Sequence, residues 1–104
     1  MSSNPAPQTP AAPAATVTIS IVHPTEGATV SNPISADGTF SPVTATVTAW
    51  VIDGSGQRRD GTVTKNVNDW SATFPTAAAG AGQVHAKAQV GTQSAEDFKN
   101  ITIR

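Results

Sequence analysis

The chain of 104 residues contains no leucine, and this limits its possible folds more than any other feature of the sequence. Leucine is the usual apolar residue of helical cores because its side chain loses little freedom in a helix. Threonine (15 residues) and valine (10 residues) are abundant instead, and their branched side chains fit the pleated surface of a β-sheet. The composition therefore predicts an all-β protein and excludes a helix bundle, a coiled coil and a membrane span.

Apolar and polar residues alternate along most of the chain after residue 15, which is typical of strands that bury one face. Val17, Ile19 and Ile21, for example, alternate with Thr18 and Ser20. Glycine, proline, asparagine and aspartate separate the alternating segments, as expected for turns. The predicted strands cover residues 16–22, 28–30, 34–40, 43–53, 62–67, 70–74, 83–90 and 98–103. Because each buries one face, they predict an antiparallel β-sandwich of about seven or eight strands.

The predicted core consists of the inward-facing residues of these strands. Trp50 or Trp70 supplies its large central side chain. Residues 43–53 form the longest predicted strand, and Trp50 interrupts the threonine stripe on its outer face, which indicates partial cover on both sides. Phe98 has the wrong parity for the inward face of residues 98–103, which predicts a bulge or a loop anchor before that strand. The core candidates are Ile19, Ile21, Phe40, Val47, Trp70, Phe74, Ala86 and Ala88.

Residues 1–15 differ in composition from the single domain predicted at residues 16–104. Pro5, Pro7, Pro10 and Pro13 are separated by uncharged residues, and proline favours an extended polyproline-like path. Such a segment cannot bury enough surface to fold alone. It also lacks the basic start and the apolar run of a signal peptide. Two interpretations remain open, a linker and an arm that anchors the domain to a protein partner.

Three segments of the domain resemble the bacterial and bacteriophage immunoglobulin-like domain superfamily. They are residues 21–30 (IVHPTEGATV), residues 68–75 (NDWSATFP) and residues 82–88 (GQVHAKA). The resemblance covers residues 16–104 and implies an immunoglobulin-like sandwich. It also implies a mostly non-catalytic role, as a spacer or adhesive module of a bacterial surface protein, an accessory domain of a secreted carbohydrate-active enzyme, or a decoration on a phage particle. No binding residue can be transferred, because the family has no fixed binding motif.

The chain offers few groups for nucleophilic catalysis. His23 lies in a proline-flanked turn, and His85 lies on the polar face of a predicted strand. Ser55 stands between two glycines but lacks the strand-to-helix setting of a catalytic serine, so a hairpin turn explains it. We therefore predict no catalytic residue, no enzymatic activity and no cofactor.

Metal binding is also not indicated by the sequence. The chain has no cysteine, and its seven carboxylates are scattered among turns without the spacing of a calcium loop. Glu96 and Asp97 could form a surface calcium site only if the fold placed them beside Asp53 or Asp69. We predict that these residues cap turns and favour solubility, and that the chain has no metal site.

Arg58 and Arg59 form the only basic cluster in a chain with a net charge of −1. Two arginines cannot create the extended positive field that nucleic-acid binding requires. They are interpreted either as a solvated hairpin tip or as contacts to a protein partner, since arginine is enriched in interfaces. Trp50 could similarly be a platform for a surface glycan, or part of the core.

Three functions are compatible with the sequence. The first is a bacteriophage virion protein, a capsid decoration, tail or head-surface protein that is made in the host cytoplasm and anchored by its arm. The start at Met1 and the lack of a secretion signal or sorting motif favour it. The second is an adhesion or spacer module of a larger extracellular bacterial protein. The third is an accessory domain of a secreted enzyme that binds polysaccharide through Trp50 or Trp70.

Overall fold

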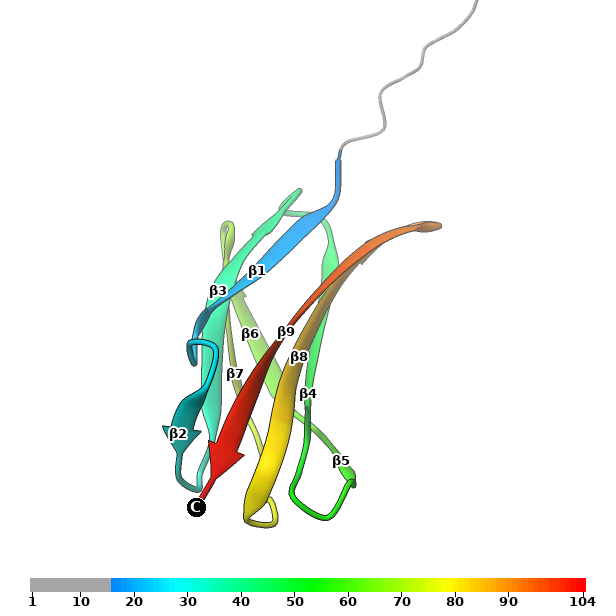
Figure 1. Cartoon of the computed structure of the whole chain (residues 1–104). Coiled ribbons are helices and arrows are strands. Elements are labelled where there is room, and N and C mark those ends of the chain that lie inside the picture. Colours follow the sequence, from blue (N-terminus) through cyan, green and yellow to red (C-terminus); the bar gives the residue numbers. More distant parts are fainter. Residues whose placement is uncertain (1–15) are drawn as a thin grey trace, which may run out of the picture.

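The computed structural model describes residues 16–104, and these contain nine strands and no helix. The strands are β1 (Thr18–His23), β2 (Ala28–Val30), β3 (Ser35–Ser41), β4 (Thr46–Ile52), β5 (Arg58–Asp60), β6 (Thr62–Asn66), β7 (Asp69–Thr73), β8 (Gly80–Val90) and β9 (Gln93–Ile103) (Figure 1). The predicted all-β fold is confirmed for this part of the chain. The proposed arm, with Pro5, Pro7, Pro10 and Pro13, lies outside the described residues.

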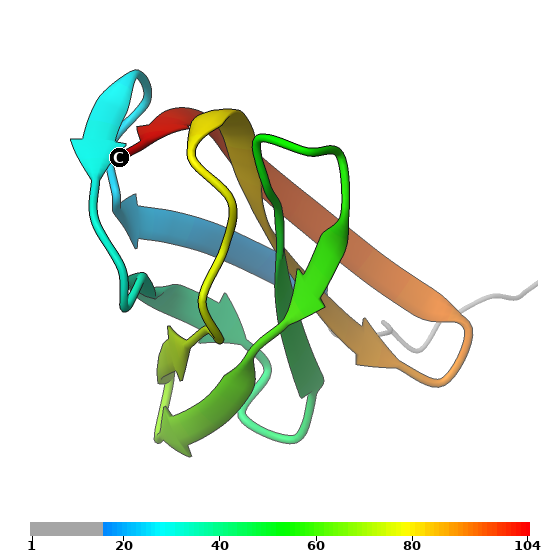
Figure 2. The same cartoon turned by 90° about the horizontal axis from the view of Figure 1, so that it is seen from below.

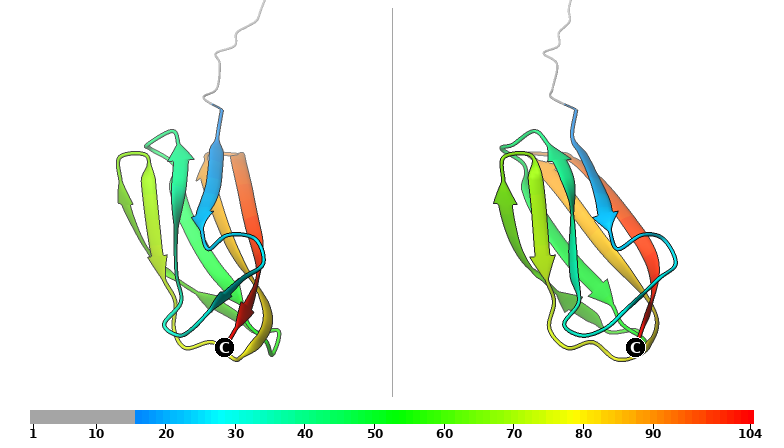
Figure 3. Two further views of the ribbon diagram at one scale, coloured as in Figure 1. Left: turned by 60° about the vertical axis from the view of Figure 1, so that its left-hand side comes forward. Right: turned by 90° about the vertical axis from the view of Figure 1, so that its left-hand side faces the viewer.

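Two sheets pack face to face, which confirms the predicted β-sandwich (Figure 2). One sheet has the strand order β1-β3-β7-β6, and the other has the order β2-β9-β8-β4-β5. The described strands pair antiparallel except for β2, which lies parallel to β9 with Ala28 opposite Ile101. The exception arises because the turn at residues 24–27 carries the chain from one sheet to the other without reversing its direction (Figure 3).

The core lies between the sheets and uses the alternating side chains of both. Trp70 is its largest fully buried side chain, and its Nε1 donates a hydrogen bond to the Ser20 carbonyl oxygen (3.2 Å). The indole fits there because residue 38, opposite Trp70 on β3, is a glycine. Among the core candidates Ile19 is partly buried against this cluster. The buried candidates are Ile21, Phe40, Val47, Trp70, Phe74, Ala86 and Ala88.

Several strands differ from the sequence-based expectation: β5 has no counterpart among the predicted strands, β8 begins at Gly80 rather than at residue 83, and β9 begins at Gln93 rather than at residue 98. β4 begins at Thr46 rather than at residue 43, because the Ala45 amide donates to the Pro42 carbonyl (2.9 Å) and closes a turn that leaves Val43 half-exposed. The longest strands are β8 and β9, which pair without interruption around a tight turn at Gly91. The bulge predicted before Phe98 is therefore wrong, since Phe98 points outward from the middle of a continuous strand.

Candidate functional site

Four side chains form a row across the outer face of the five-stranded sheet, and we call this row the aromatic strip. Arg58 on β5, Trp50 on β4, His85 on β8 and Phe98 on β9 come from four neighbouring strands. The register places Trp50 opposite His85, and His85 opposite Phe98. Sheet pairing therefore brings together residues that are separated by up to 48 positions in the sequence, from 50 to 98.

The rings of the aromatic strip stack on one another. The ring centroids of Trp50 and His85 are 5.2 Å apart with an interplanar angle of 6°, and those of His85 and Phe98 are 5.4 Å apart at 20°. The Arg58 guanidinium carbon lies 4.2 Å from the centroid of the Trp50 ring, in a cation–π arrangement. Because the faces of the inner rings cover one another, solvent meets mainly ring edges and the half-exposed Phe98.

A chain of polar contacts begins at the central histidine of the strip. His85 Nδ1 lies 3.2 Å from Glu96 Oε2, and His85 Nε2 lies 2.9 Å from Gln83 Oε1. Gln83 Nε2 donates to Asn100 Oδ1 (3.1 Å), and Asn100 Nδ2 donates to Glu26 Oε2 (2.8 Å). The hydrogen bonds from the Asn100 side chain and backbone hold the pKa of Glu26 below its usual value. Glu96 Oε2 and Gln83 Oε1 are both acceptors, so the imidazole donates to whichever of them faces its N–H, and stacking between Trp50 and Phe98 orients the ring.

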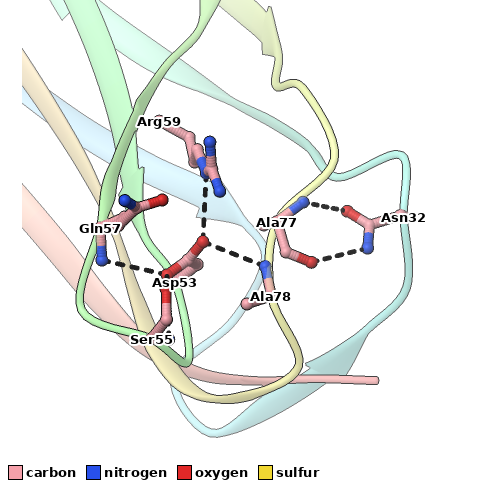
Figure 4. A network of polar contacts seen from close by, with 7 residues as sticks. All are labelled: Asn32, Asp53, Ser55, Gln57, Arg59, Ala77 and Ala78. Atoms are coloured by element: carbon pink, nitrogen blue, oxygen red, sulfur yellow. Dashed lines mark hydrogen bonds and ion pairs between the residues drawn. The ribbon is translucent and has the colours of Figure 1, made fainter.

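The second polar cluster surrounds Asp53, whose side chain is fully buried (Figure 4). Its Oδ1 accepts hydrogen bonds from the Ser55 amide (2.9 Å), the Ser55 hydroxyl (2.6 Å) and the Gln57 amide (3.0 Å). Its Oδ2 accepts from Arg59 Nε (3.1 Å) and from the Ala78 amide (3.0 Å). These donors, led by the Ser55 hydroxyl, hold the pKa of Asp53 far below its usual value.

The contacts of Asp53 are those of a structural clamp. They tie the turn between β4 and β5 to the segment between β7 and β8. Asn32 extends the clamp, because its Oδ1 accepts from the Ala77 amide and its Nδ2 donates to the Ala77 carbonyl, both at 3.0 Å (Figure 4). A buried carboxylate is stable only when its oxygens are hydrogen-bonded, and both oxygens of Asp53 accept hydrogen bonds. Ser55 and Arg59 therefore have a structural role, because their side chains donate to this buried carboxylate.

The structure separates the two arginines that the sequence places together. Arg58 is exposed, lies on the aromatic strip and pairs with Asp60 (2.8 Å), whereas Arg59 turns toward the buried Asp53. Trp50 is half-buried on the outer face of its sheet. Trp70 has no exposed ring face for a sugar, so the suggestion that it binds polysaccharide is wrong.

The carboxylates considered for calcium have other partners or positions. Asp53 is enclosed in the clamp, and Asp97 Oδ2 accepts a hydrogen bond from the Ile21 amide (2.9 Å) across the edge between the sheets. Glu96 is directed at His85. Within residues 16–104, no group of three or more histidine, aspartate or glutamate side chains is arranged to hold a metal ion. The same residues contain no helix that could cross a membrane.

Sequence reasoning missed both the strip and the clamp. One signal for the strip exists, because Trp50, His85 and Phe98 all have the parity of the polar face in their strands. Parity cannot show that the three rings lie side by side, since this depends on the register between strands. The clamp has no comparable signal, because Ala78 contributes only a backbone amide.

Comparison with known proteins finds a structure of similar fold but no family. No family model and no curated protein sequence matches this chain. Among solved structures, the chain is similar to an engineered protein from the Northeast Structural Genomics Consortium, with 17% sequence identity and a TM-score of 0.63. The match covers 85% of this chain and 20% of the engineered protein, so this chain spans about a fifth of that protein's length. At this identity the likeness concerns the fold alone.

Proposed function

We propose that the chain is an immunoglobulin-like, non-enzymatic interaction module that binds a protein partner through the aromatic strip. The sheet orders support the immunoglobulin-like assignment, because β1-β3-β7-β6 corresponds to the A-B-E-D sheet of that fold. The other sheet, with the neighbours β9, β8, β4 and β5, corresponds to the G-F-C-C′ arrangement. In this assignment β2 is the part of the first strand that crosses to the opposite sheet.

The composition of the aromatic strip and the stacking of its side chains are the observation that carries the proposal. Tryptophan and arginine are the residue types most enriched at the energetic centres of protein interfaces. Here Arg58 and Trp50 are already stacked, and His85 is stacked between Trp50 and Phe98. Binding would therefore order few side chains, which lowers its entropic cost. A sugar stacking on Trp50 is less favoured, since His85 and Arg58 cover its ring.

We further propose that the module decorates the surface of a bacteriophage virion. The described chain begins at one end of the sandwich and finishes at the opposite end, so a module held at its N-terminal side would direct the other end outward (Figure 1). Pro5, Pro7, Pro10 and Pro13 would contact the particle in this arrangement. Many copies on one lattice would convert weak contacts into high avidity.

The same placement of the ends supports a second candidate, an adhesion or spacer module of an extracellular bacterial protein. Modules whose ends lie opposite one another can be joined in series. The two candidates differ in what the purified chain binds, namely a phage particle or a bacterial cell surface.

Co-sedimentation tests both candidates. The full chain is mixed with purified tailed-phage particles or with bacterial cell walls, and the bound fraction is measured against chain concentration. We expect the double variant Arg58→Ala/Phe98→Ala to bind at least about tenfold more weakly, since hot-spot truncations cost about 2 kcal/mol or more. Ser35→Ala, exposed on the other sheet, is the matched control and should bind like the wild type. Equal binding by the double variant would refute the role of the strip.

A further inference from the structure

The turn between β6 and β7 holds an unusual residue. Val67 has a φ of 57°, in the left-handed region that a branched side chain rarely adopts, and is the only non-glycine residue with positive φ in the described chain. Asn66 pairs with Asp69, so the turn has two central residues, and positive φ at the first of them suits glycine or asparagine. A branched residue at this position strains the backbone.

Val67 is also exposed, so packing within the domain does not explain it. Its side chain is 71% exposed, the highest value among the exposed large apolar residues of the described chain. Val43, in the loop between β3 and β4, is 49% exposed. The two segments are joined, because the Phe40 amide donates to the Asn68 carbonyl (2.8 Å) and Asn68 Nδ2 donates to the Phe40 carbonyl (2.9 Å).

These valines lie at the end of the sandwich where the described chain begins. Figures 1 and 3 both place the β6–β7 turn, the β3–β4 loop, the β8–β9 turn and the start of β1 at this end. The segments concerned, residues 16–19, 41–46, 66–68 and 89–94, contain no charged residue, and the charged residues nearest to the β6–β7 turn are Lys65 and Asp69. The Lys65 ammonium is engaged in the domain, because its Nζ donates to the Ala45 carbonyl of the β3–β4 loop (2.8 Å).

We propose that this end, which we call the valine end, is seated through its exposed valines on a partly apolar protein surface of the assembly that carries the module. This inference rests on the proposed function and adds a second contact, distinct from the aromatic strip. The described chain begins at this end, and residues 1–15, which precede it in the sequence, have no charged side chain, so a partner that binds at this end is in reach of Val67 and Val43. Backbone strain at an exposed position persists when the residue serves binding rather than stability.

Replacing Val67 distinguishes a role of this residue in binding a partner from a role only in the stability of the domain. Val67→Asn removes the apolar side chain and the backbone strain together, so it should stabilise the domain and weaken its attachment. A residue with only a structural role cannot produce opposite changes in the two measurements. Val43→Ser tests the neighbouring loop, and Ser31→Ala, exposed in the turn before β3, is the control.

The experiment combines urea unfolding with co-sedimentation on purified tailed-phage particles, using the full chain. We expect Val67→Asn to raise the urea midpoint and to weaken particle binding at least about fivefold. Binding within twofold of the wild type by both Val67→Asn and Val43→Ser, or an unchanged urea midpoint for Val67→Asn, would overturn the inference.

The strip variant distinguishes this failure from failure of the proposed function. If Arg58→Ala/Phe98→Ala loses binding and neither Val67→Asn nor Val43→Ser does, the valine end is refuted and the strip is supported. If only the Val67 and Val43 variants lose binding, the valine end is supported and the strip is refuted. A wild-type chain that sediments with no particle would refute both.

Discussion

Replacing Gly38 with alanine tests the packing that places Trp70 in the core. Gly38 lies on β3 between Ile21 of β1 and Trp70 of β7. A Cβ added there would overlap the Ser20 carbonyl oxygen and lie 2.9 Å from Trp70 Nε1. These two atoms form the 3.2 Å hydrogen bond of the buried indole, so the methyl group must push them apart.

The free energy of unfolding that Gly38→Ala loses has two parts, which can be estimated separately. A buried donor left without its partner costs about 1–3 kcal/mol, and forcing an extra methyl group into a packed core costs about 1–3 kcal/mol. Gly38→Ala should therefore lose about 2–6 kcal/mol, a large share of the roughly 5–15 kcal/mol that stabilises a typical domain. For a domain of this size the melting temperature should fall by roughly 8 °C or more.

Urea unfolding followed by tryptophan fluorescence measures this loss. Ser35→Ala is the control on the same strand, because Ser35 is exposed on the outer face, and it should stay within about 0.5 kcal/mol of the wild type. If Gly38→Ala also stayed within 0.5 kcal/mol, β1 would be free to move away from β3 at this point, and the reasoning would be refuted.

Three further outcomes are expected. Because the pKa of Asp53 is lowered on folding, its contribution to stability is present above the ordinary aspartate pKa of about 3.9 and is lost as the pH falls below it. Asp53→Asn should be less stable near pH 7, because its side-chain amide would face the Ala78 N–H, which is also a donor. The variant should also lack the acid-dependent loss of stability, which is measured as the urea midpoint from pH 2 to 7. Val67→Asn should gain about 1 kcal/mol in the same assay, and a loss would show that the turn is unstrained. In Trp50→Phe the remaining fluorescence comes from Trp70, and it should be blue-shifted and weakly quenched by acrylamide because Trp70 is buried. Strong quenching by acrylamide would contradict the burial of Trp70.

The alternation of side chains carries most of the information about the fold. It indicates an all-β sandwich because threonine and valine at every second position leave each strand one apolar face. Phe40, Trp70 and Phe74 lie in the core, where their parity places them. The pattern fails at residue 98, where the parity of an outward aromatic residue predicts a bulge although β9 is continuous. The parity of Phe98 is that of the outer face, and the mistake is to infer an irregular strand from an aromatic residue on that face.

The candidate sites are far less predictable than the core. A turn carboxylate such as Asp53 has the same local sequence whether it is solvated or buried, and only the approach of Ala78 and Arg59 decides between these outcomes. The parallel pairing of β2 with β9 likewise depends on where a turn directs the chain, which polarity patterns do not encode. Contacts between segments distant in sequence are set by the packing of the whole domain.

The sequence by itself determined the class of the fold, because stiff branched side chains in alternation and the lack of leucine suit pleated strands and not helices. It also determined which face of most strands is buried. Only the tertiary structure decided that Trp50, His85 and Phe98 stack into one surface, and that Val67 stands exposed at the end where the described chain begins. The reason is physical, since periodicity acts within a strand, whereas register and sheet order act between strands and arise only when the whole core packs.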